Sequence, residues 1–530
     1  MCAINGLYSY RPTAPAVDLA ELRATRDYMA ARGPDGQGAW LSADGRLGLG
    51  HRRLAIIDLS AAAAQPMASA DGRYHLVFNG EIYNHRALRR ELEAQGCVFR
   101  THSDTEVILH LFARRYADQG PAILLALRGM FAFALWDSTR RQIFLARDPY
   151  GIKPLYYAED GGTLRFASQV KALLAGGALS RDPDPAGLVG FHLFGHVPEP
   201  FTWYRAIRAL PAGHSLLIDE RGPGTPIAYH RIAQVYADAE ASLDPLPPTP
   251  SHQGRGSQIK EALLDSVRHH LEADVPVGAF LSAGIDSGSL VGLMRDASAR
   301  VPALGRGLRR LAVCLLGTQL DQAGSTRASQ GQTRRLRHLP PKLPGLLEYG
   351  GTLAGAYLLR RGLFMPWELE ILLDPQFGPD TARAGLERLD PRGLIQAQFQ
   401  PNGPRGTFAR VATLESSLYL RNQLLRDTDW AGMAHGLEIR VPLVDAHLLA
   451  QVAPLTCRAF GLSDRRATPK QWLALAPSRP LPDAIRNRPK TGFGTPLSHW
   501  LSDPTAAPGA PPATYGYSRG WACLIAASWG

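Results

Sequence analysis

The chain has 530 residues, of which 45% are hydrophobic and 20% are charged, a composition that excludes a mainly disordered chain, a coiled coil and a collagen-like repeat. Basic residues outnumber acidic ones by 58 to 47, giving a net charge of +11, which leaves binding to nucleic acid or to an anionic membrane open. The length suits three to four domains of about 150 residues, or two large ones.

Cysteine usage and hydropathy favour a cytoplasmic protein. The five cysteines, Cys2, Cys97, Cys314, Cys457 and Cys523, are widely spread and form no CxxC pair, which argues against a disulfide framework and a structural zinc site. The N-terminus lacks the pattern of a secretory signal. No run of about 18 uninterrupted apolar residues predicts a membrane span. We therefore expect a soluble protein of a reducing cytoplasm, with no membrane partner.

Residues 2–215 show the mixture of short strands and helices that is typical of an α+β layered domain. The predicted strands include residues 46–58, 74–82, 130–136, 142–146 and 164–167. The predicted helices lie at residues 19–31, 85–95 and 105–116. Glycine-rich turns separate these elements and mark their ends.

A connector at residues 216–257 is expected to separate this domain from a second one, because 236–257 carries Pro, Ser, Gly and Ala without periodicity. The second domain is predicted over 258–503, where a helix at 258–272, a strand at 274–281 and a helix at 287–295 indicate α/β order. Residues 345–500 read as mostly helical. Two stretches, 301–342 and 504–530, lack convincing periodicity and are poor candidates for packed structure.

Cys2 directly follows Met1, and removal of Met1 would make it the N-terminal residue. Its thiol would then lie beside its own α-amine, whose pKa of about 7.7–8.0 suits a general base at neutral pH. A thiol with a pKa of about 8.5 needs only modest activation to attack a carbonyl. Position alone favours an ordinary residue, so the assignment depends on the motifs that follow.

Seven motifs accompany Cys2, and their order and spacing resemble the N-terminal-nucleophile glutamine amidotransferase domain, above all that of glutamine-hydrolysing asparagine synthetases. The motifs are RGPDG (32–36), GHRRLAIIDLS (50–60), QPM (65–67), VFNGEIYNH (77–85), HSDTEVIL (102–109), LRGMFAFALWD (127–137) and ARDPYGIKPLYY (146–157). The resemblance covers essentially all of residues 2–215 and implies an αββα sandwich fold.

The resemblance also implies a role for each matching residue. Cys2 would attack the side-chain amide of glutamine, with the Asn79 side chain and the Gly80 backbone N–H as oxyanion donors. Arg53 would pair with the α-carboxylate of glutamine, and Asp104, helped by Glu81, would hold the α-ammonium group. Backbone groups around two further residues would line the glutamine pocket: Leu54 and Ile56.

The segment FLSAGIDSGSLVGLM (280–294) follows an apolar stretch and opens a predicted helix, whose N–H groups suit an anion. It resembles the pyrophosphate loop of ATP pyrophosphatases, with Ala283 in place of the middle glycine. The implied ATP-binding residues are Leu281, Ser282, Gly284, Asp286, Ser287 and Lys470. Mg²⁺ would bridge the phosphate oxygens, with Asp286 as its candidate protein ligand.

The segments MAHGLEIRVPLVD (433–445) and RPKTGFGTPLSHWL (488–501) also resemble the synthetase family. The implied reaction makes asparagine in three steps. ATP activates aspartate as β-aspartyl-AMP, glutamine supplies ammonia, and the ammonia displaces AMP. Glutamine, aspartate and ATP would be the partners, no nucleic acid is expected, and the resemblance allows a homodimer.

One family signature, SGxGxDE, has no counterpart in the chain, and the likeness stops after Ala299 and resumes near Leu343. The intervening stretch 301–342 holds eight basic residues and one acidic residue, so it supplies most of the net charge and weakens the case for a polyanion partner. A deletion with a frameshift would produce such a stretch, and 504–530 would share that origin. We therefore expect a complete glutaminase half and an incomplete, defective α/β synthetase half.

Three alternatives remain open from the sequence. An amidotransferase of the same architecture could act on another carboxylate acceptor, since the acceptor region is the part that departs from the family. A glutaminase-only or non-catalytic remnant would lack synthesis altogether. A nucleic-acid-binding role would need a basic face interleaved with aromatic residues on a folded element.

Overall fold

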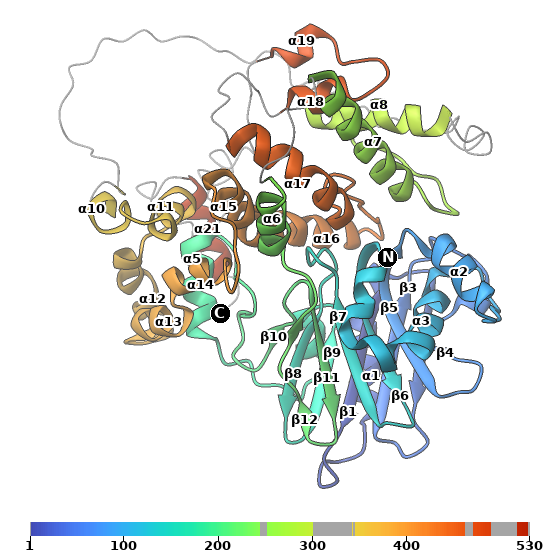
Figure 1. Cartoon of the computed structure of the whole chain (residues 1–530). Coiled ribbons are helices and arrows are strands. Elements are labelled where there is room, and N and C mark those ends of the chain that lie inside the picture. The colour runs from blue at the N-terminus through green and yellow to red at the C-terminus, as the bar shows by residue number, and fades with distance from the viewer. Residues whose placement is uncertain are drawn as a thin grey trace.

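The computed structural model describes residues 2–243, 252–282, 284–299, 342, 345–461, 470–488 and 517–527. Figure 1 shows a two-layered body of strands at the lower right, with helices gathered above it and to its left. The first strands and the last helix lie in different parts of the molecule, so the chain runs from the β body into the helical part.

Two antiparallel sheets form the β body. The first has six strands in the order β10-β8-β9-β1-β3-β2, and its members are β1 (Ala3–Ser9), β2 (Gly36–Leu41), β3 (Leu47–Arg53), β8 (Tyr156–Asp160), β9 (Thr163–Ala167) and β10 (Arg208–Ala209). The second has seven strands in the order β12-β11-β7-β6-β5-β4, with β13 paired to β11. Its members are β4 (Met67–Ala68), β5 (Tyr74–Ile82), β6 (Gly129–Asp137), β7 (Gln142–Arg147), β11 (His214–Asp219), β12 (Gly222–Pro223) and β13 (Ile227–Ala228).

Strand β6 shows why the sheets stack in layers. Its residues Gly129–Asp137 are almost all buried, and successive side chains point to opposite faces. Phe131 and Phe133 enter the cluster that packs beneath helices α2 (His85–Ala94) and α3 (Asp104–Gln119). Ala132 and Ala134 enter the cluster between the sheets. A strand covered on both faces must be apolar throughout, which explains the run MFAFALW.

Helices α1 (Leu19–Tyr28) and α4 (Val170–Ala175) cover the outer face of the six-stranded sheet, where Met29 and Leu173 join a cluster with Ala3 and Ala167. The short turn η1 (Ala30–Arg32) follows α1, and η2 (Ala61–Ala63) and η3 (Gly120–Ala126) lie in loops of the β body. Helices thus flank both sheets, and the predicted αββα sandwich is confirmed.

The remaining helices form the second part of the molecule (Figure 1). They are α5 (Pro185–Phe194), α6 (Ile232–Ala241), α7 (His252–His270), α8 (Ile285–Ala299), α10 (Gly345–Tyr349), α11 (Leu353–Arg361), η5 (Pro366–Glu368), α12 (Leu369–Phe377), α13 (Thr381–Leu389), α14 (Pro391–Ala397), α15 (Thr407–Leu414), the π-helix η6 (Glu415–Leu425), α16 (Arg426–Met433), α17 (Ala446–Gly461), α18 (Gln471–Leu475), α19 (Asp483–Arg486) and α21 (Tyr517–Ala527). Helix α5 comes from the N-terminal region of the sequence, yet it packs against α13 and shares its apolar cluster.

Two sequence expectations for this part are wrong, and a third stays a prediction. Residues 274–281 form no strand; Phe280 is 64% exposed, and a strand needs a paired neighbour that the described residues of this part do not supply. The linker expected at 236–257 overlaps the end of α6 and the start of α7, and residues 244–251 between them lie outside the described residues. The tail at 504–530 contains α21, because Ala522 and Ala526 lie one turn apart and are buried in the helical cluster.

The described residues contain no candidate membrane-spanning helix and no disulfide. None of their helices is long and apolar enough to cross a membrane. The four described cysteines, Cys2, Cys97, Cys457 and Cys523, form no disulfide with one another, while Cys314 lies outside the described residues. The anomalous stretch 301–342 also lies outside them, apart from Lys342.

Candidate active site

Cys2 lies at the start of β1, at the edge of the sandwich that faces the helical part. The side chain is buried, and its Sγ donates to the Leu54 carbonyl oxygen at 3.8 Å. Burial raises the pKa of the Cys2 thiol, while the N-terminal amine lowers it. The thiol is therefore protonated at neutral pH and needs a base before it can act as a nucleophile.

Asn79 and Gly80 lie side by side on β5, in register with Ala132 and Phe131 of β6. The Asn79 side chain is fully buried, and neither its Nδ2 nor its Oδ1 has a hydrogen-bond partner among the described residues. An unpaired buried amide is costly and calls for an explanation. A Cβ on Gly80 would lie 2.1 Å from the Met130 carbonyl oxygen, so only glycine fits there. A donor kept free beside a nucleophile suits a developing oxyanion.

Glu81 and Asp104 form an acidic wall near the same place. The Asp104 Oδ2 atom accepts from the Ile82 backbone N–H at 2.9 Å, which ties the first residue of α3 to strand β5. Burial raises the pKa of Glu81 well above its ordinary value, and the nearby Glu438 raises it further. Burial likewise raises the pKa of Asp104. Buried carboxylates so close together favour a bound ammonium group.

Arg53 ends strand β3, and its guanidinium donates to the Ser60 carbonyl at 2.8 Å and to the Asp58 carbonyl. The loop between them is held from the helical part by Asp274. Its backbone N–H donates to the Ile56 carbonyl at 2.9 Å, and its carboxylate accepts from the Asp58 backbone N–H at 2.8 Å. The structure therefore places Arg53, Leu54 and Ile56 on one strand end and loop, with Leu54 touching Cys2.

Two residues of the helical part reach this site, and the sequence prediction did not include them. Arg440 lies 3.6 Å from the Glu81 carboxylate and pairs with Glu438 at 2.5 Å. It also donates to the carbonyls of His270 and Glu272. Although burial opposes ionisation, Arg440 lowers the pKa of Glu438 to about 2. The only sequence signal was the alternating pair Glu438–Arg440 inside the family-like segment 433–445.

Further buried ion pairs join the β body to the helical part. Arg32 donates to both carboxylate oxygens of Asp429, at 2.7 and 3.2 Å, and Lys153 lies 3.6 Å from the same carboxylate. Arg128 pairs with Asp445 at 2.6 Å and with Asp265 at 2.7 Å. These pairs tie the β body to the helical part.

The candidate nucleotide loop precedes helix α8. The Ser287 hydroxyl accepts from the Ser282 backbone N–H at 3.0 Å and lies 2.9 Å from the Ser282 hydroxyl. The Gly284 N–H donates to the Ser282 hydroxyl at 3.2 Å. Asp286 and Lys470, which are 184 residues apart, form an ion pair here. The structure thus brings together the predicted residues of this loop, next to Leu281, while Ala283 lies outside the described residues.

The donor set at this loop offers little to a metal ion by itself. No group of three or more His, Cys, Asp or Glu side chains in the described chain is arranged to hold one. Asp286 is one carboxylate and is half exposed. Asp286 would hold the Mg²⁺ that accompanies a bound nucleotide, and the ion would supply positive charge against the phosphates.

Comparisons with known protein families divide the chain into two matches. Residues 1–228 match the family described as glutamine amidotransferase domain. Residues 258–324 and 327–507 match the family described as asparagine synthase. The second match runs through the stretch 301–342 apart from residues 325–326. The prediction that the likeness stops after Ala299 and resumes near Leu343 is therefore wrong.

Two curated relatives span nearly the whole chain. "Asparagine synthetase [glutamine-hydrolyzing] 1" of Bacillus subtilis is 28% identical over 95% of this chain and 88% of its own length. The "putative asparagine synthetase [glutamine-hydrolyzing]" of Mycobacterium tuberculosis is 31% identical over 89% of this chain and 83% of its own length. The Bacillus alignment has 583 positions against 530 residues here, so part of it has no counterpart in this chain.

Among solved structures, the glutamine phosphoribosylpyrophosphate amidotransferase of B. subtilis matches with a TM-score of 0.33 and 20% identity. The match covers 56% of this chain and 64% of that one. The sandwich fold of this chain is shown by its own two antiparallel sheets.

Proposed function

Because the chain belongs to the family of glutamine-hydrolysing asparagine synthetases, we propose that its β body releases ammonia from glutamine. The observation that carries this proposal is the Asn79 amide, which is buried on β5 without a hydrogen-bond partner among the described residues. We propose further that the helical part uses ATP to activate aspartate for amidation by that ammonia, and that the protein works in the cytoplasm.

In the glutaminase step, Met1 is first removed, and the freed α-amine of Cys2 takes the thiol proton. The Sγ atom then attacks the side-chain carbonyl carbon of glutamine. Asn79 Nδ2 and the Gly80 N–H donate to the oxygen as it becomes negative. The amine returns the proton to the leaving nitrogen, ammonia departs, and water hydrolyses the thioester to glutamate.

Substrate orientation falls to the charged groups around the nucleophile. Glu81 and Asp104 hold the α-ammonium group, whose positive charge offsets their mutual repulsion. Arg53 binds the α-carboxylate through its guanidinium, in exchange for one of the loop carbonyls it contacts in the structure. Arg440 pairs with Glu438 and so leaves Glu81 available to the substrate.

In the synthetase step, Ser282, Gly284 and Ser287 bind the pyrophosphate of ATP at the start of α8. Lys470 turns from Asp286 to the phosphates as the nucleotide enters, and Asp286 is then free to contact the magnesium of the nucleotide. Bound Mg²⁺ supplies positive charge against the phosphates. The β-carboxylate of aspartate attacks the α-phosphorus to give β-aspartyl-AMP and pyrophosphate, and ammonia displaces AMP.

We propose that the synthetase half is defective in this chain. No SGxGxDE segment is present, and residues 274–281, which lead into the nucleotide loop, are unpaired and carry an exposed Phe280. A nucleotide loop needs a rigid strand beneath it to hold its position. Glutamine hydrolysis should therefore outpace asparagine formation by a wide margin.

The test uses the full chain in two assays. Glutamate release from glutamine should be measurable and should vanish in Cys2→Ala, whereas the control Cys97→Ala, a buried cysteine outside the site, should keep it. Asparagine formation with ATP and aspartate should stay near background with glutamine or with ammonium chloride. Glutamate release that survives in Cys2→Ala would refute the glutaminase assignment, and efficient asparagine formation would refute the defect.

The origin of the defect has its own test. The nucleotide sequence across codons 300–345 should encode a better family match in another reading frame, because the chain lacks the SGxGxDE signature. If no frame improves the match or yields the SGxGxDE signature, the frameshift hypothesis is wrong. A homodimer remains a prediction, which the mass of the particle in solution would check.

A further inference from the structure

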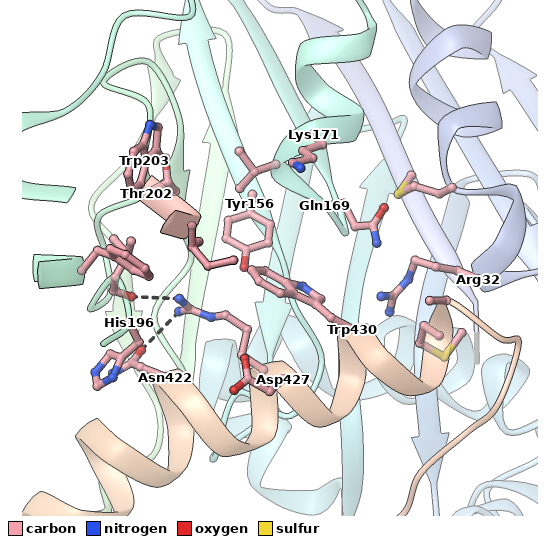
Figure 2. A pocket seen from close by; sticks show the side chains of 18 of the residues that line it. Arg32, Tyr156, Gln169, Lys171, His196, Thr202, Trp203, Asn422, Asp427 and Trp430 are labelled. Atoms are coloured by element: carbon pink, nitrogen blue, oxygen red, sulfur yellow. Dashed lines mark hydrogen bonds between the residues drawn. The ribbon is translucent and has the colours of Figure 1, made fainter. Parts of the chain in front are cut away.

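A cavity of about 540 Å³ lies between the β body and the helical part, and none of the residues assigned above to glutamine or ATP lines it. Its walls come from the end of α1, the start of α4, the end of α5, and helix α16. Figure 2 shows α16 running along one side, with side chains from the β body facing it. The volume is within the range of about 300–1,000 Å³ that small-molecule sites occupy.

The lining is rich in aromatic side chains. Six of its 22 residues are aromatic, against 8% of the whole chain. In Figure 2 the Trp430 indole lies across the cavity beside the Tyr156 ring. Trp430 is 39% exposed, which is a high value for such a large apolar side chain. Flat aromatic side chains in a cavity wall favour a planar ring that stacks on them.

The polar groups of the cavity favour an anion. The lining includes three basic side chains, Arg32, Lys171 and Arg426, and one acidic side chain, Asp427. His196 adds no charge at neutral pH, because burial lowers its pKa to about 3. Arg426 is occupied by the Val197 carbonyl and the Asn422 side chain, so the anchor for an anion must come from another group.

Arg32 provides that anchor. Its side chain is 2% exposed, and its two terminal nitrogens bind Asp429, but its Nε has no hydrogen-bond partner in the described part of the chain. A buried N–H of a guanidinium left unpaired is costly. Figure 2 shows the Gln169 amide close to the Arg32 guanidinium, on the side of the cavity that the β body forms. A carboxylate between them would accept from both.

From these contacts we propose that the cavity binds a small aromatic carboxylate, with its ring against Trp430 and Tyr156 and its carboxylate between Arg32 and Gln169. Because the ligand touches both the β body and α16, its binding stabilises the junction between the two parts. This site is independent of the glutaminase and synthetase assignments, since it shares no residue with either.

The test titrates the full chain with three probes of matched shape: 2-naphthylacetate, its neutral amide, and 2-naphthylethylamine. Calorimetry should show one site for the carboxylate, and the amide and the amine should bind at least about tenfold more weakly, since the loss of a charged hydrogen bond costs that much. At saturation the carboxylate should raise the Tm by about 2–4 °C. Cyclohexylacetate should bind more weakly than the aromatic acid.

Variants locate the site. Trp430→Ala should weaken the carboxylate about tenfold or more, whereas Trp367→Ala, an equally exposed tryptophan at 41% outside the cavity, should bind as the parent does. Gln169→Leu should abolish the preference for the acid over the amide. Ala434→Phe adds a ring to the exposed Ala434 on the cavity wall and should block binding. The Tm of each unliganded variant checks its folding.

Several results would overturn the proposal. It fails if 2-naphthylacetate does not bind the parent up to its solubility limit, if the amide binds as tightly as the acid, or if the amine binds best. It also fails if Trp430→Ala and Ala434→Phe both bind like the parent. Should one variant not fold, the other and Gln169→Leu decide.

Discussion

Replacing Asn79 with leucine should separate catalysis from stability in this protein. The Asn79 amide is fully buried and makes no hydrogen bond in the structure, so the unliganded protein loses no bond when the amide is removed. In the glutaminase reaction the same Nδ2 would donate to the developing oxyanion. The substitution therefore acts on the transition state and not on the contacts of the resting fold.

Asn79→Leu should lower the catalytic rate but should not lower the free energy of unfolding. Loss of one oxyanion donor lowers kcat by about 10²–10³-fold, or about 2.7–4 kcal/mol. An unsatisfied buried amide costs about 1–3 kcal/mol, and leucine of similar volume removes that cost. Asn79→Leu should thus leave the free energy of unfolding unchanged or raise it by about 1–3 kcal/mol, while glutamate release falls at least about a hundredfold with little change in KM.

The assay pairs glutamate release with thermal unfolding, and Asn84 supplies the control. Its side chain donates to the Ala126 carbonyl at 2.9 Å and accepts from the Arg128 backbone N–H at 3.0 Å. Asn84→Leu breaks both bonds and should lower the free energy of unfolding by about 1–3 kcal/mol. The reasoning is refuted if Asn79→Leu destabilises the protein as much as Asn84→Leu does, or if it raises KM while kcat stays unchanged.

Three further substitutions test the surroundings of the site. Hydrogen bonds to Glu106, including one from the Thr101 N–H at 2.8 Å, outweigh burial and lower the pKa of Glu106 to about 2. The stabilisation that ionised Glu106 contributes is therefore complete above about pH 4.5 and is lost as the pH falls toward 2. Glu106→Gln should lower the Tm at pH 7 and lower it progressively less toward pH 3, and an equal loss at both pH values would contradict this. Asp429→Asn leaves Arg32 and Lys153 buried without their anion and should cost about 3–5 kcal/mol in urea unfolding, a prediction that a loss below about 1 kcal/mol would disprove. Gln65 accepts from the Phe78 N–H at 2.7 Å, next to Asn79, so Gln65→Ala should lower kcat for glutamate release more than it raises KM, with the reverse split as the contrary result.

The sandwich was predictable because its strands carry a strong local signal. Strand β5 begins and ends where the sequence predicts it, at Tyr74 and Ile82. Its residues alternate between two apolar layers, Leu76 and Phe78 toward one and Val77 toward the other. Apolar side chains that alternate between two layers, in a segment bounded by glycine and polar turns, indicate a strand and do not fit a helix.

The helical part was harder to predict because its elements depend on distant partners. Helix α21 lies in a stretch rich in Ala, Pro and Gly, and it is held by Arg519, which pairs with Glu368 at 2.7 Å, 151 residues away. The apolar run at 274–281 has the composition of a strand, yet the described residues give it no partner. Composition specifies a propensity, and pairing decides the structure.

The candidate site was also predicted in its β-body residues and missed in those of the helical part. Motif likeness predicted the members that the β body supplies, from Cys2 to Asp104, and the structure brings Cys2 and Leu54 into contact. Glu438 and Arg440 were not predicted as site residues, because their role comes from packing against Glu81 across the junction. No local pattern reports a contact between residues more than 350 positions apart.

The path of the chain between its two parts limits how the protein can be divided. Strands β11 to β13 close one side of the seven-stranded sheet, so a fragment that stops at residue 215 would bare the unpaired edge of β7 and invite aggregation. The same fragment contains helix α5, which would then expose the apolar face that it buries against α13. A working glutaminase fragment must therefore extend past Ala228, and even then α5 would lack its cover. Limited proteolysis should accordingly release no stable N-terminal piece, because α5 and the ion pairs Arg32–Asp429 and Arg128–Asp445 tie the β body to the helical part.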